Sequence, residues 1–556
     1  MGKQVTRRQP MRGVPRARWM AGAAVLALSL AACGGGGGGG ESSGKTGGTF
    51  RLGIVEPTAI DPYNAQESEG ILVAHQLFTG LVDVKADGTI VPKLAEQRSP
   101  NDNCTEWTFK IKQGTKFTNG EPVDAEAFIR GWTRAAKKSA ASDVAYHLAG
   151  IQGFDQLQAG TTQTFAGLSA PDPYTLKVKL SQPDCEFDLK TYHTVFSPVP
   201  KVAGEANNKQ YNDQPIGNGP FKMEGPWQHN TKITLVRNDD YGFEKAKLDR
   251  VEISILNPQN ADQLEYQGFE SGKFDWARMP TPQLPAAKAK YEPQGQWIGQ
   301  DTNGMNYLLP ITDNGPMKTK EARLAVSYAI DRQTITQGVF KGMQTPSTTI
   351  VPPAFKDFYQ QGLCQSCQKQ DPAKAKEYAQ KANLPPGSAV TLAFNTGGGH
   401  DEWVQAVAQQ LRDVLGWKVE IKPMPFKELL EAEQQPGATG LFRFAWGADY
   451  PTPDNYLFPL LHTKSINKDA SGKVTGDNRS RWSNPQFDQL VDKARATKDP
   501  NERKKLYQQA EKIAIEEMAL IPLWNRTQYR LANTKKFTNL ELDFNENPTL
   551  AQVALK

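Results

Sequence analysis

Beyond its first segment, the sequence lacks any apolar run long enough to span a membrane. A spanning helix needs about 18 uninterrupted apolar residues, and no stretch after residue 32 approaches that length. The catalytic motif H-E-x-x-H is also missing. The motif G-x-S-x-G and the phosphate loop G-x-x-x-x-G-K-[ST] each occur once, at 40–44 and 39–46, but both matches fall in a glycine-rich stretch rather than between a strand and a helix. The six histidines show no metal-ligand spacing. These observations argue against a hydrolase of those classes and against a histidine metal centre.

A surplus of positive charge is also lacking once the N-terminal segment is set aside. The first 32 residues contain no acid and six basic side chains: Lys3, Arg7, Arg8, Arg12, Arg16 and Arg18. Removing these six positive charges from the formal net charge of +5 leaves −1 for the remainder. We therefore expect no nucleic-acid partner, since such partners require a basic surface.

The N-terminal segment is typical of a secretion signal. A basic stretch precedes a short apolar run over 20–30 and two small residues, Ala31 and Ala32. Cys33 follows directly and resembles the acylated cysteine of the bacterial lipoprotein signal. We predict a signal peptide over 1–32, a lipidated Cys33 at the outer face of the cell membrane and a glycine-rich tether over 33–48. An ordinary signal peptide is the alternative, and Sec and twin-arginine export both stay open.

Periodicity predicts a mixed α/β chain of two or three domains, since the 524 residues left after the signal exceed one ordinary core. Alternating apolar residues predict strands, and amphipathic spacing predicts helices. The predicted strands are 49–55, 107–112, 174–180, 389–394, 418–422 and 520–524, and the predicted helices are 71–81, 124–138, 320–329, 331–339, 402–415, 485–493 and 501–517. The strand–helix–strand order around 389–422 indicates parallel pairing.

Four cysteines remain after Cys33, and they allow three pairings: Cys104, Cys185, Cys364 and Cys367. The C-x-x-C pair is compatible with a redox pair, half of a zinc site or a small disulfide. No second C-x-x-C exists to complete a zinc cage, and the flanking sequence is loop-like rather than a strand leading into a helix. We predict a loop disulfide between Cys364 and Cys367 and a second bond between Cys104 and Cys185.

A series of short segments carries a resemblance that covers nearly all of the chain after residue 48. They include Ile60-Asp61-Pro62, residues 77–81, the run GTKFTNGEPV at 114–123, PIGNGPF at 215–221, residues 322–332 and Ile521-Pro522-Leu523. In order and spacing the chain resembles the family-5 extracytoplasmic peptide-binding proteins of bacterial ABC importers.

The resemblance implies an α/β, two-lobed periplasmic-binding-protein-like fold of the class II type, with an extra α+β domain inserted in lobe I. Lobe I would comprise 49–86, 211–300 and 525–556, the extra domain 87–210 and lobe II 301–524. The implied function is a monomeric receptor, without enzymatic activity or cofactor, that delivers peptides to an ABC permease. Another solute, such as a nickel chelate or an oligosaccharide, and a ligand-sensing lipoprotein are the alternatives.

The resemblance also implies ligand-binding residues, chiefly in the segment FRFAWGADY at 442–450. Asp449 would pair with the ligand's α-ammonium, and Trp446 would line a neighbouring pocket. The peptide backbone would add as a strand to Phe444–Gly447 of lobe II and to Gln66–Ser68 of lobe I. Simple structural roles are the alternatives, namely a turn cap for Asp449, core packing for Trp446 and a solvated loop around Gln66.

The resemblance places two cations, Arg443 and His400, near a ligand carboxylate. Arg443 is able to bind a carboxylate with two parallel hydrogen bonds. The alternatives are a solvated strand residue for Arg443 and a solvated loop residue for His400. Gly447 stands where some relatives have a disulfide-bonded cysteine, so we expect a pocket wall of different shape.

Overall fold

The computed structural model describes residues 44–85, 87–396, 399–469 and 471–556. The predicted signal peptide, the lipidated Cys33 and most of the predicted tether lie outside these residues. In the described ranges, no helix has both the length and the apolar character needed to cross a bilayer.

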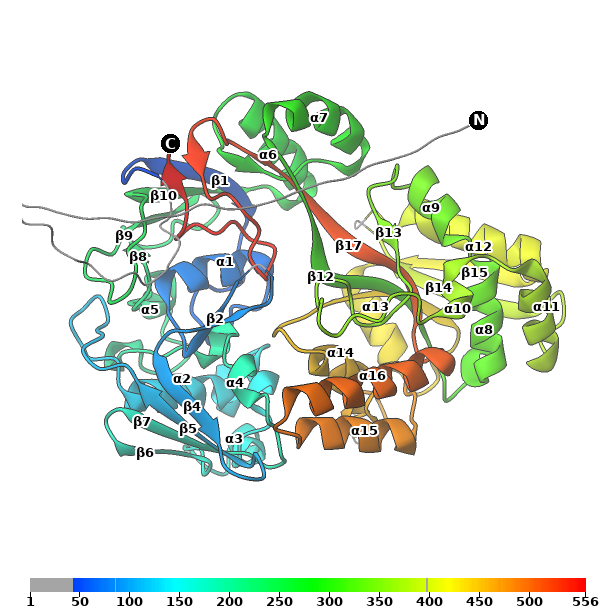
Figure 1. Ribbon diagram of the computed structural model, residues 1–556, viewed down its shortest axis with the longest axis horizontal. Helices are drawn as coiled ribbons and strands as arrows, with labels where there is room; N and C mark the ends of the chain where they lie inside the picture. The colour runs from blue at the N-terminus through cyan, green and yellow to red at the C-terminus, as the bar shows by residue number, and fades with distance from the viewer. Residues whose placement is uncertain (1–43, 86, 397–398, 470) are drawn as a thin grey trace, which may run out of the picture. The chain divides into compact units, whose positions relative to one another are not determined.

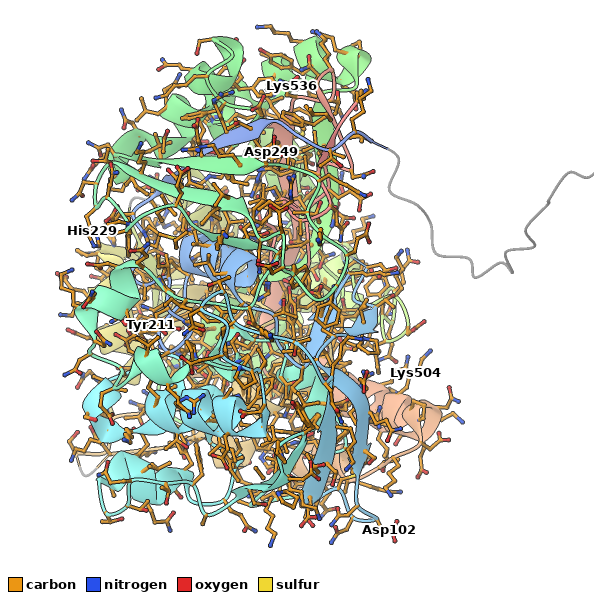
Figure 2. All side chains as sticks on the ribbon, turned by 90° about the vertical axis from the view of Figure 1, so that its left-hand side faces the viewer. Asp102, Tyr211, His229, Asp249, Lys504 and Lys536 are labelled. Carbon is orange, nitrogen blue, oxygen red and sulfur yellow. A yellow bond between two sulfur atoms is a disulfide. The ribbon has the colours of Figure 1, made fainter. Side chains whose placement is uncertain are left out.

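The described chain is already held in place before Thr49, where structure was expected to begin. Lys45 exchanges two backbone hydrogen bonds with Leu555, of 2.7 and 3.1 Å. The N–H of Gly48 donates to the Asp249 carboxylate at 3.0 Å, and the ammonium of Lys536 lies 3.5 Å from the carbonyl of Thr49 (Figure 2). The predicted tether through residue 48 is therefore too long at its C-terminal end.

An N-terminal sheet has the strand order β1-β10-β9-β8. Strand β1 (Thr49–Val55) is parallel to β10 (Arg250–Leu256). Strand β9 (Lys232–Arg237) is antiparallel to both of its neighbours, β10 and β8 (Phe221–Met223). The predicted strand at 49–55 is confirmed, and its alternate residues Phe50 and Leu52 are buried in the core.

The helix that follows, α1, spans Ser68–Leu77 rather than the predicted 71–81. The amide of Asn218 binds both the N–H and the carbonyl of Thr79, at 3.1 and 3.0 Å. These long-range bonds hold the segment after Leu77 extended, which local sequence does not reveal.

A second, antiparallel sheet has the order β4-β5-β7-β6, formed by β4 (Ala95–Pro100), β5 (Glu106–Ile111), β7 (Thr175–Lys179) and β6 (Leu168–Asp172). Helix α2 (Ala125–Ala136) packs on it and begins at the predicted cap, where Asp124 accepts a hydrogen bond of 2.9 Å from the N–H of Ala127. Phe128 and Trp132 face the same core, with their rings edge to face.

The large sheet has the order β11-β17-β12-β16-β14-β15, and β13 pairs with β17. Its strands are β11 (Trp276–Ala277), β12 (Trp297–Pro310), β13 (Thr345–Pro346), β14 (Ala389–Asn395), β15 (Lys418–Met424), β16 (Leu441–Gly447) and β17 (Ile521–Ala532). β14 and β15 are parallel and are joined by α12 (Asp401–Leu415), as predicted. Helices α8 (Lys320–Ala329) and α11 (Pro372–Lys381) pack together beside α12.

Strands β12 and β17 pair over most of their length and run side by side as the longest ribbons in Figure 1. Each has one end in the core of the large sheet, at Leu308 and Ile521. Their other ends pack elsewhere, since Ala532 belongs to the core of the N-terminal sheet and Ile298 packs against it. The predicted strand at 520–524 is thus only the first part of β17, because the next residues, 525–528, are polar and show no alternation.

The remaining elements are short or connect the sheets. They are β2 (Val82–Val84), β3 (Ile90–Pro92), α3 (Phe154–Ala159), α4 (Phe187–Lys190), α5 (Lys209–Asp213), α6 (Ala261–Glu270), α7 (Leu284–Tyr291), α9 (Arg332–Gly338), α10 (Gln365–Gln368), α13 (Phe426–Gln434), α14 (Asp454–Leu461), α15 (Pro485–Arg495), α16 (Pro500–Glu516), β18 (Phe537–Thr538) and β19 (Ala554–Leu555).

The sulfur atoms lie in the two predicted pairs, at 1.94 Å for Cys104 and Cys185 and at 2.00 Å for Cys364 and Cys367. A loop is predicted for the second pair, but the pair instead spans the start of the short helix α10. Cys364 caps this helix, and its carbonyl accepts a hydrogen bond of 3.2 Å from the N–H of Cys367.

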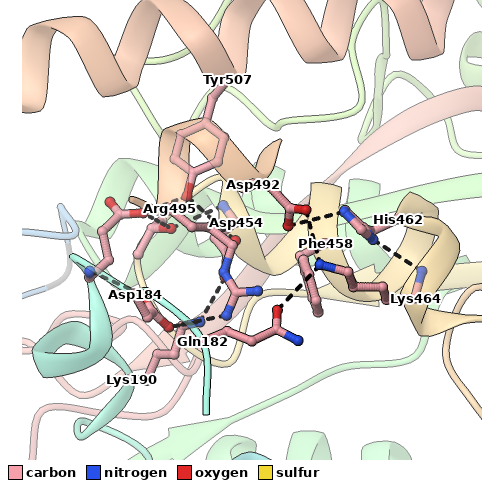
Figure 3. A network of polar contacts seen from close by, with 12 residues as sticks. Gln182, Asp184, Lys190, Asp454, Phe458, His462, Lys464, Asp492, Arg495 and Tyr507 are labelled. Carbon is pink, nitrogen blue, oxygen red and sulfur yellow. Dashed lines mark hydrogen bonds and ion pairs between the residues drawn. The ribbon is translucent and has the colours of Figure 1, made fainter. Parts of the chain in front are cut away.

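A buried ionic network joins the segment 182–190 to helices α14, α15 and α16 (Figure 3). The Lys190 ammonium lies 2.6 Å from Asp184 and 2.8 Å from Asp454. Arg495 approaches the same two carboxylates at 3.3 and 3.5 Å and lies over the Phe458 ring at 4.0 Å. This network fastens the antiparallel sheet to the helices of the large sheet.

Candidate ligand-binding site

Strand β16 has one paired and one largely open edge. Along one edge it pairs with β12 from Gly304↔Gly447 to Pro310↔Leu441. On the other edge, β14 pairs only with Leu441 and Phe442. Among the described strands, none pairs with Arg443–Gly447 on that side, so its backbone groups are available to an added strand.

Side chains alternate along β16 and give its two faces different characters. Phe444 is only 7% exposed, stacks on Tyr307 and lies under the Arg479 guanidinium at 5.7 Å, so its side chain belongs to the core. The opposite face has Arg443 and Gly447, both half-buried. Phe444 is therefore available to a ligand only through its backbone.

Asp449, two residues beyond the strand, is an acid without a cationic partner in the described structure. Its carboxylate accepts one hydrogen bond, of 3.2 Å, from the Asn455 side-chain amide. Removal from water raises its pKa to about 7, despite this hydrogen bond, and the negative charge of Asp477 adds to the rise. A ligand ammonium would supply the missing positive charge.

Asn455, on α14, fixes the geometry around Asp449. Its carbonyl oxygen accepts hydrogen bonds from the indole N–H of Trp446 at 2.9 Å and from the backbone N–H of Asp449 at 3.1 Å. The predicted ligand residues Trp446 and Asp449 are thus held by one buried amide, which is 2% exposed.

The surroundings of Asp449 are rich in acid. Asp477 pairs with Arg479 at 3.5 Å, and Arg479 also pairs closely with Glu433. Partial removal from water and the nearby charges of Asp449 and Asp477 raise the pKa of Tyr146 well above its ordinary value. Tyr146 comes from the antiparallel-sheet region, so two distant parts of the chain meet here.

Among the described residues, Arg443 is a cation without an acidic partner. One guanidinium nitrogen donates to the Asn395 side chain at 3.1 Å, and the buried Nε has no hydrogen-bond partner in the described structure. Burial lowers its pKa to about 10. Burial also lowers the pKa of His400 to about 3, and the positive charge of Arg443 adds to this effect. The predicted pair therefore lies close together, with His400 neutral and accepting from Trp403 at 3.2 Å.

Of the two predicted lobe I residues, Gln66 lies in a loop and Ser68 lies in a helix. The Gln66 amide donates to Asp143 at 3.3 Å, three residues before Tyr146, which links its loop to the surroundings of Asp449. Ser68 is the first residue of α1, and its carbonyl accepts from Asn547 at 3.2 Å. Ser68 therefore cannot belong to an extended edge as expected, because its backbone is helical.

The cavity nearest to Asp449 in the chain does not include the predicted ligand residues, and no metal-binding group lies in the described ranges. A cavity of about 240 Å³ lies beyond Asp449 and is lined by Asn303, Pro451, Asp543 and Phe544 among others, but by none of the predicted ligand residues. In the described ranges, no group of three or more His, Cys, Asp or Glu side chains is placed to hold a metal ion.

Three further residues at the site were not predicted from the sequence: Asn455, Asp477 and Arg526. The guanidinium of Arg526 reaches Gly447 from β17, since a Cβ atom added to Gly447 would lie 3.9 Å from its Nη1. Only the proximity of Asn455 to Asp449 in the chain offered a signal, because the other two residues reach the site through the fold.

The fold and the open strand edge define a binding protein, and comparisons with known proteins identify its family. The model for "Bacterial extracellular solute-binding proteins, family 5 Middle" matches residues 89–468. The oligopeptide-binding protein OppA of Bacillus subtilis is 30% identical over 523 residues, covering 90% of this chain and 92% of OppA. The dipeptide-binding protein DppE of the same organism is 28% identical over 500 residues, covering 86% of both chains.

A solved structure gives the same result. The Escherichia coli murein tripeptide binding protein MppA superposes with a TM-score of 0.72 at 26% identity, covering 91% of this chain and 98% of MppA. The chain belongs to the family-5 bacterial extracellular solute-binding proteins, the binding components of ABC importers. Its predicted two-lobed α/β fold is thereby confirmed.

Proposed function

We propose that this protein is an extracytoplasmic receptor that binds peptides between its two lobes and delivers them to an ABC permease. The observation that carries the proposal is the pair of uncompensated charges at the two ends of one open strand edge. Asp449 lacks a cation and Arg443 lacks an acid in the described structure, as a zwitterionic ligand requires. The names of the relatives OppA and DppE support the same ligand class.

The spacing of these groups suits a short peptide. Arg443 and Gly447 are four steps apart on an extended strand, about 13 Å at roughly 3.3 Å per residue. Asp449 lies two residues further along the chain. An extended peptide of about four residues, antiparallel to β16, would place its ammonium at Asp449 and its carboxylate near Arg443 and His400. Backbone pairing with Phe444–Gly447 would hold it without regard to side-chain identity.

The domain boundaries are proposed as predicted, with lobe I at 49–86, 211–300 and 525–556, the extra domain at 87–210 and lobe II at 301–524. Supporting this division, each sheet has a hydrophobic core of its own. The boundaries at 300 and 525 fall inside β12 and β17, the two strands whose ends pack in different cores. These strands would form the hinge on which the lobes close.

We also propose that the protein is located outside the cell membrane. Cys33 would be lipidated, and the protein would act as an anchored monomer near its permease. The two cysteine pairs would be oxidised, because secreted proteins meet an oxidising environment. No enzymatic activity is proposed, since the family consists of binding proteins.

Native mass spectrometry of the protein purified from its own host tests the ligand class directly. We expect co-purifying masses that fragment as peptides of about two to six residues. A nickel chelate or an oligosaccharide in their place would contradict the proposal. Peptide uptake by a strain lacking the protein separates import from sensing, because a pure sensor would leave uptake unchanged.

A further inference from the structure

Arg526 reaches the ligand site from β17 because the pairing of β17 with β12 is irregular there. Asp301 pairs with Thr527 and Met305 with Asn525, so three residues of β12 stand opposite Arg526 alone. Such bulges are common next to binding sites, where they redirect a side chain. Here the bulge turns Arg526 across the face of the sheet toward β16.

Two paired glycines leave room for this arginine. Gly304 of β12 is directly opposite Gly447 of β16. A Cβ atom on Gly304 would lie 2.7 Å from Cδ of Arg526 and 2.9 Å from its Cβ, so the stem of the arginine crosses the space that a side chain would fill. The absence of a side chain at Gly447 leaves the guanidinium close to the end of the open strand edge, since its Nη1 would lie 3.9 Å from a Cβ atom added there.

The charge of Arg526 is only partly compensated. Its Nη2 lies 3.3 Å from the Glu546 carboxylate, which also accepts a hydrogen bond of 2.7 Å from Gln528. The Arg526 side chain is 41% exposed, whereas that of Glu546 is 11% exposed. Among the described residues, Nε and Nη1 of Arg526 have no hydrogen-bond acceptor, so both nitrogens are free to donate to a ligand.

We propose that Arg526 is a specificity-determining residue that binds a carboxylate close to the N-terminus of the bound peptide. This inference rests on the proposed function and adds a preference to it. The carboxylate would belong to an acidic side chain within the first three residues, or it would be the α-carboxylate of a dipeptide. A planar guanidinium with free donors suits either source, because it matches the carboxylate fork.

The position of the Arg526 guanidinium relative to Asp449 determines which residues of the peptide it would contact. Gly447 precedes Asp449 by two residues, and Asp449 would hold the ammonium. A peptide added to the open edge lies about 4.8 Å from β16, and the side chains next to Gly447 that share its face point toward the guanidinium. Ligand residues further along lie beside Ala445 and Arg443 instead.

Calorimetry with a small set of peptides tests this inference on the wild-type protein, on Arg526→Met and on Lys505→Met, an exposed cation on α16 that serves as the control. The peptides are tetra-alanine, its three variants with glutamate at position one, two or three, and dialanine with a free or an amidated C-terminus. Thermal unfolding shows whether each variant is folded. Arg526→Lys keeps the charge but loses the fork and should retain part of any preference.

We expect at least one glutamate peptide to bind wild type about tenfold more tightly than tetra-alanine, the scale of one charge-assisted hydrogen bond. Arg526→Met should lose this gain and keep its affinity for tetra-alanine, and Lys505→Met should keep both.

If the α-carboxylate is the source, the gain appears between free and amidated dialanine instead. Equal ratios in wild type and Arg526→Met, with tetra-alanine still bound, overturn this inference alone. Failure of wild type to bind any of the peptides overturns the proposed function as well.

Discussion

At the scale of single residues, the account rests on Asp449, a carboxyl group that has no cationic partner in the described part of the chain. Asp449 is held by Asn455 and has Asp477 as its charged neighbour, so its environment disfavours the ionised form until a ligand arrives. An arriving ammonium would reverse that balance. Binding and ionisation of Asp449 are therefore coupled, which gives affinity a characteristic dependence on pH.

We predict that peptide affinity falls as the pH drops below the pKa of Asp449, about 7 in the free protein. Below that pH the free protein holds a proton that must leave before the ammonium binds, so affinity should fall about tenfold per pH unit. Asp449→Asn should bind weakly and without this slope. Calorimetry in buffers of different ionisation enthalpy counts the released proton. A flat profile for wild type between about pH 5 and pH 7 would contradict the coupling.

The sequence located some of these residues and missed others for a physical reason. Asp449, Trp446 and Arg443 lie in one short segment, so a resemblance in that segment is enough to propose them. Arg526 is placed by a bulge and by two glycines on neighbouring strands, and no local pattern encodes that meeting. The resemblance implies an extended edge at Ser68, but Ser68 is the first residue of α1, a helix whose predicted start lies three residues later.

At the scale of elements, a buried polar network connects the segment 182–190 to helices α14–α16 (Figure 3). Glu186 pairs with Arg503 at 3.1 Å and accepts from the Tyr507 hydroxyl at 2.8 Å. Burial alone would lower the pKa of Lys190, but Asp184 and Asp454 outweigh it and raise the pKa. Such a network is stable only while every charge keeps its partner.

We predict that Lys190→Met lowers the free energy of unfolding by about 3–5 kcal/mol, because it removes one of the two cations that two buried carboxylates share. Lys464→Met is the matched control. Lys464 pairs with Asp492 at 3.0 Å, but the two side chains are 51% and 41% exposed. Its loss should change the free energy of unfolding by less than about 1 kcal/mol. Equal losses in chemical denaturation would show that burial does not govern this network.

Elements were predicted well where local periodicity decides them and poorly where distant contacts do. Helix α8 has the predicted bounds, and β1 has the predicted alternation of buried residues. Helix α1 ends early because Asn218 binds Thr79, and β17 continues through polar residues because β12 pairs with them. A loop was predicted for the C-x-x-C segment because the residues on both sides of it are loop-like.

At the scale of the whole molecule, the two cysteine pairs close loops of very different size. Cys104 and Cys185 are 81 residues apart in sequence, and Cys364 and Cys367 are three apart. The loss of chain entropy in the unfolded state grows with the logarithm of loop length. Only the first pair therefore constrains a large part of the unfolded chain.

We predict that Cys104→Ser with Cys185→Ser lowers the free energy of unfolding by about 4.5 kcal/mol, and that Cys364→Ser with Cys367→Ser lowers it by about 2 kcal/mol. Urea denaturation of the oxidised proteins measures both. A larger loss from the short loop would contradict the loop-entropy account.

The central claim is that this protein binds peptides through Asp449, and calorimetry with a mixed pool of di- to hexapeptides tests it most directly. The proteins to compare are wild type, Asp449→Ala and Asp413→Ala, an exposed acid on α12 that serves as the control. We predict that wild type and Asp413→Ala bind alike, and that Asp449→Ala loses about 3–5 kcal/mol of binding free energy, the scale for one partner of a buried charge pair. Unchanged affinity in a folded Asp449→Ala protein would contradict the claim.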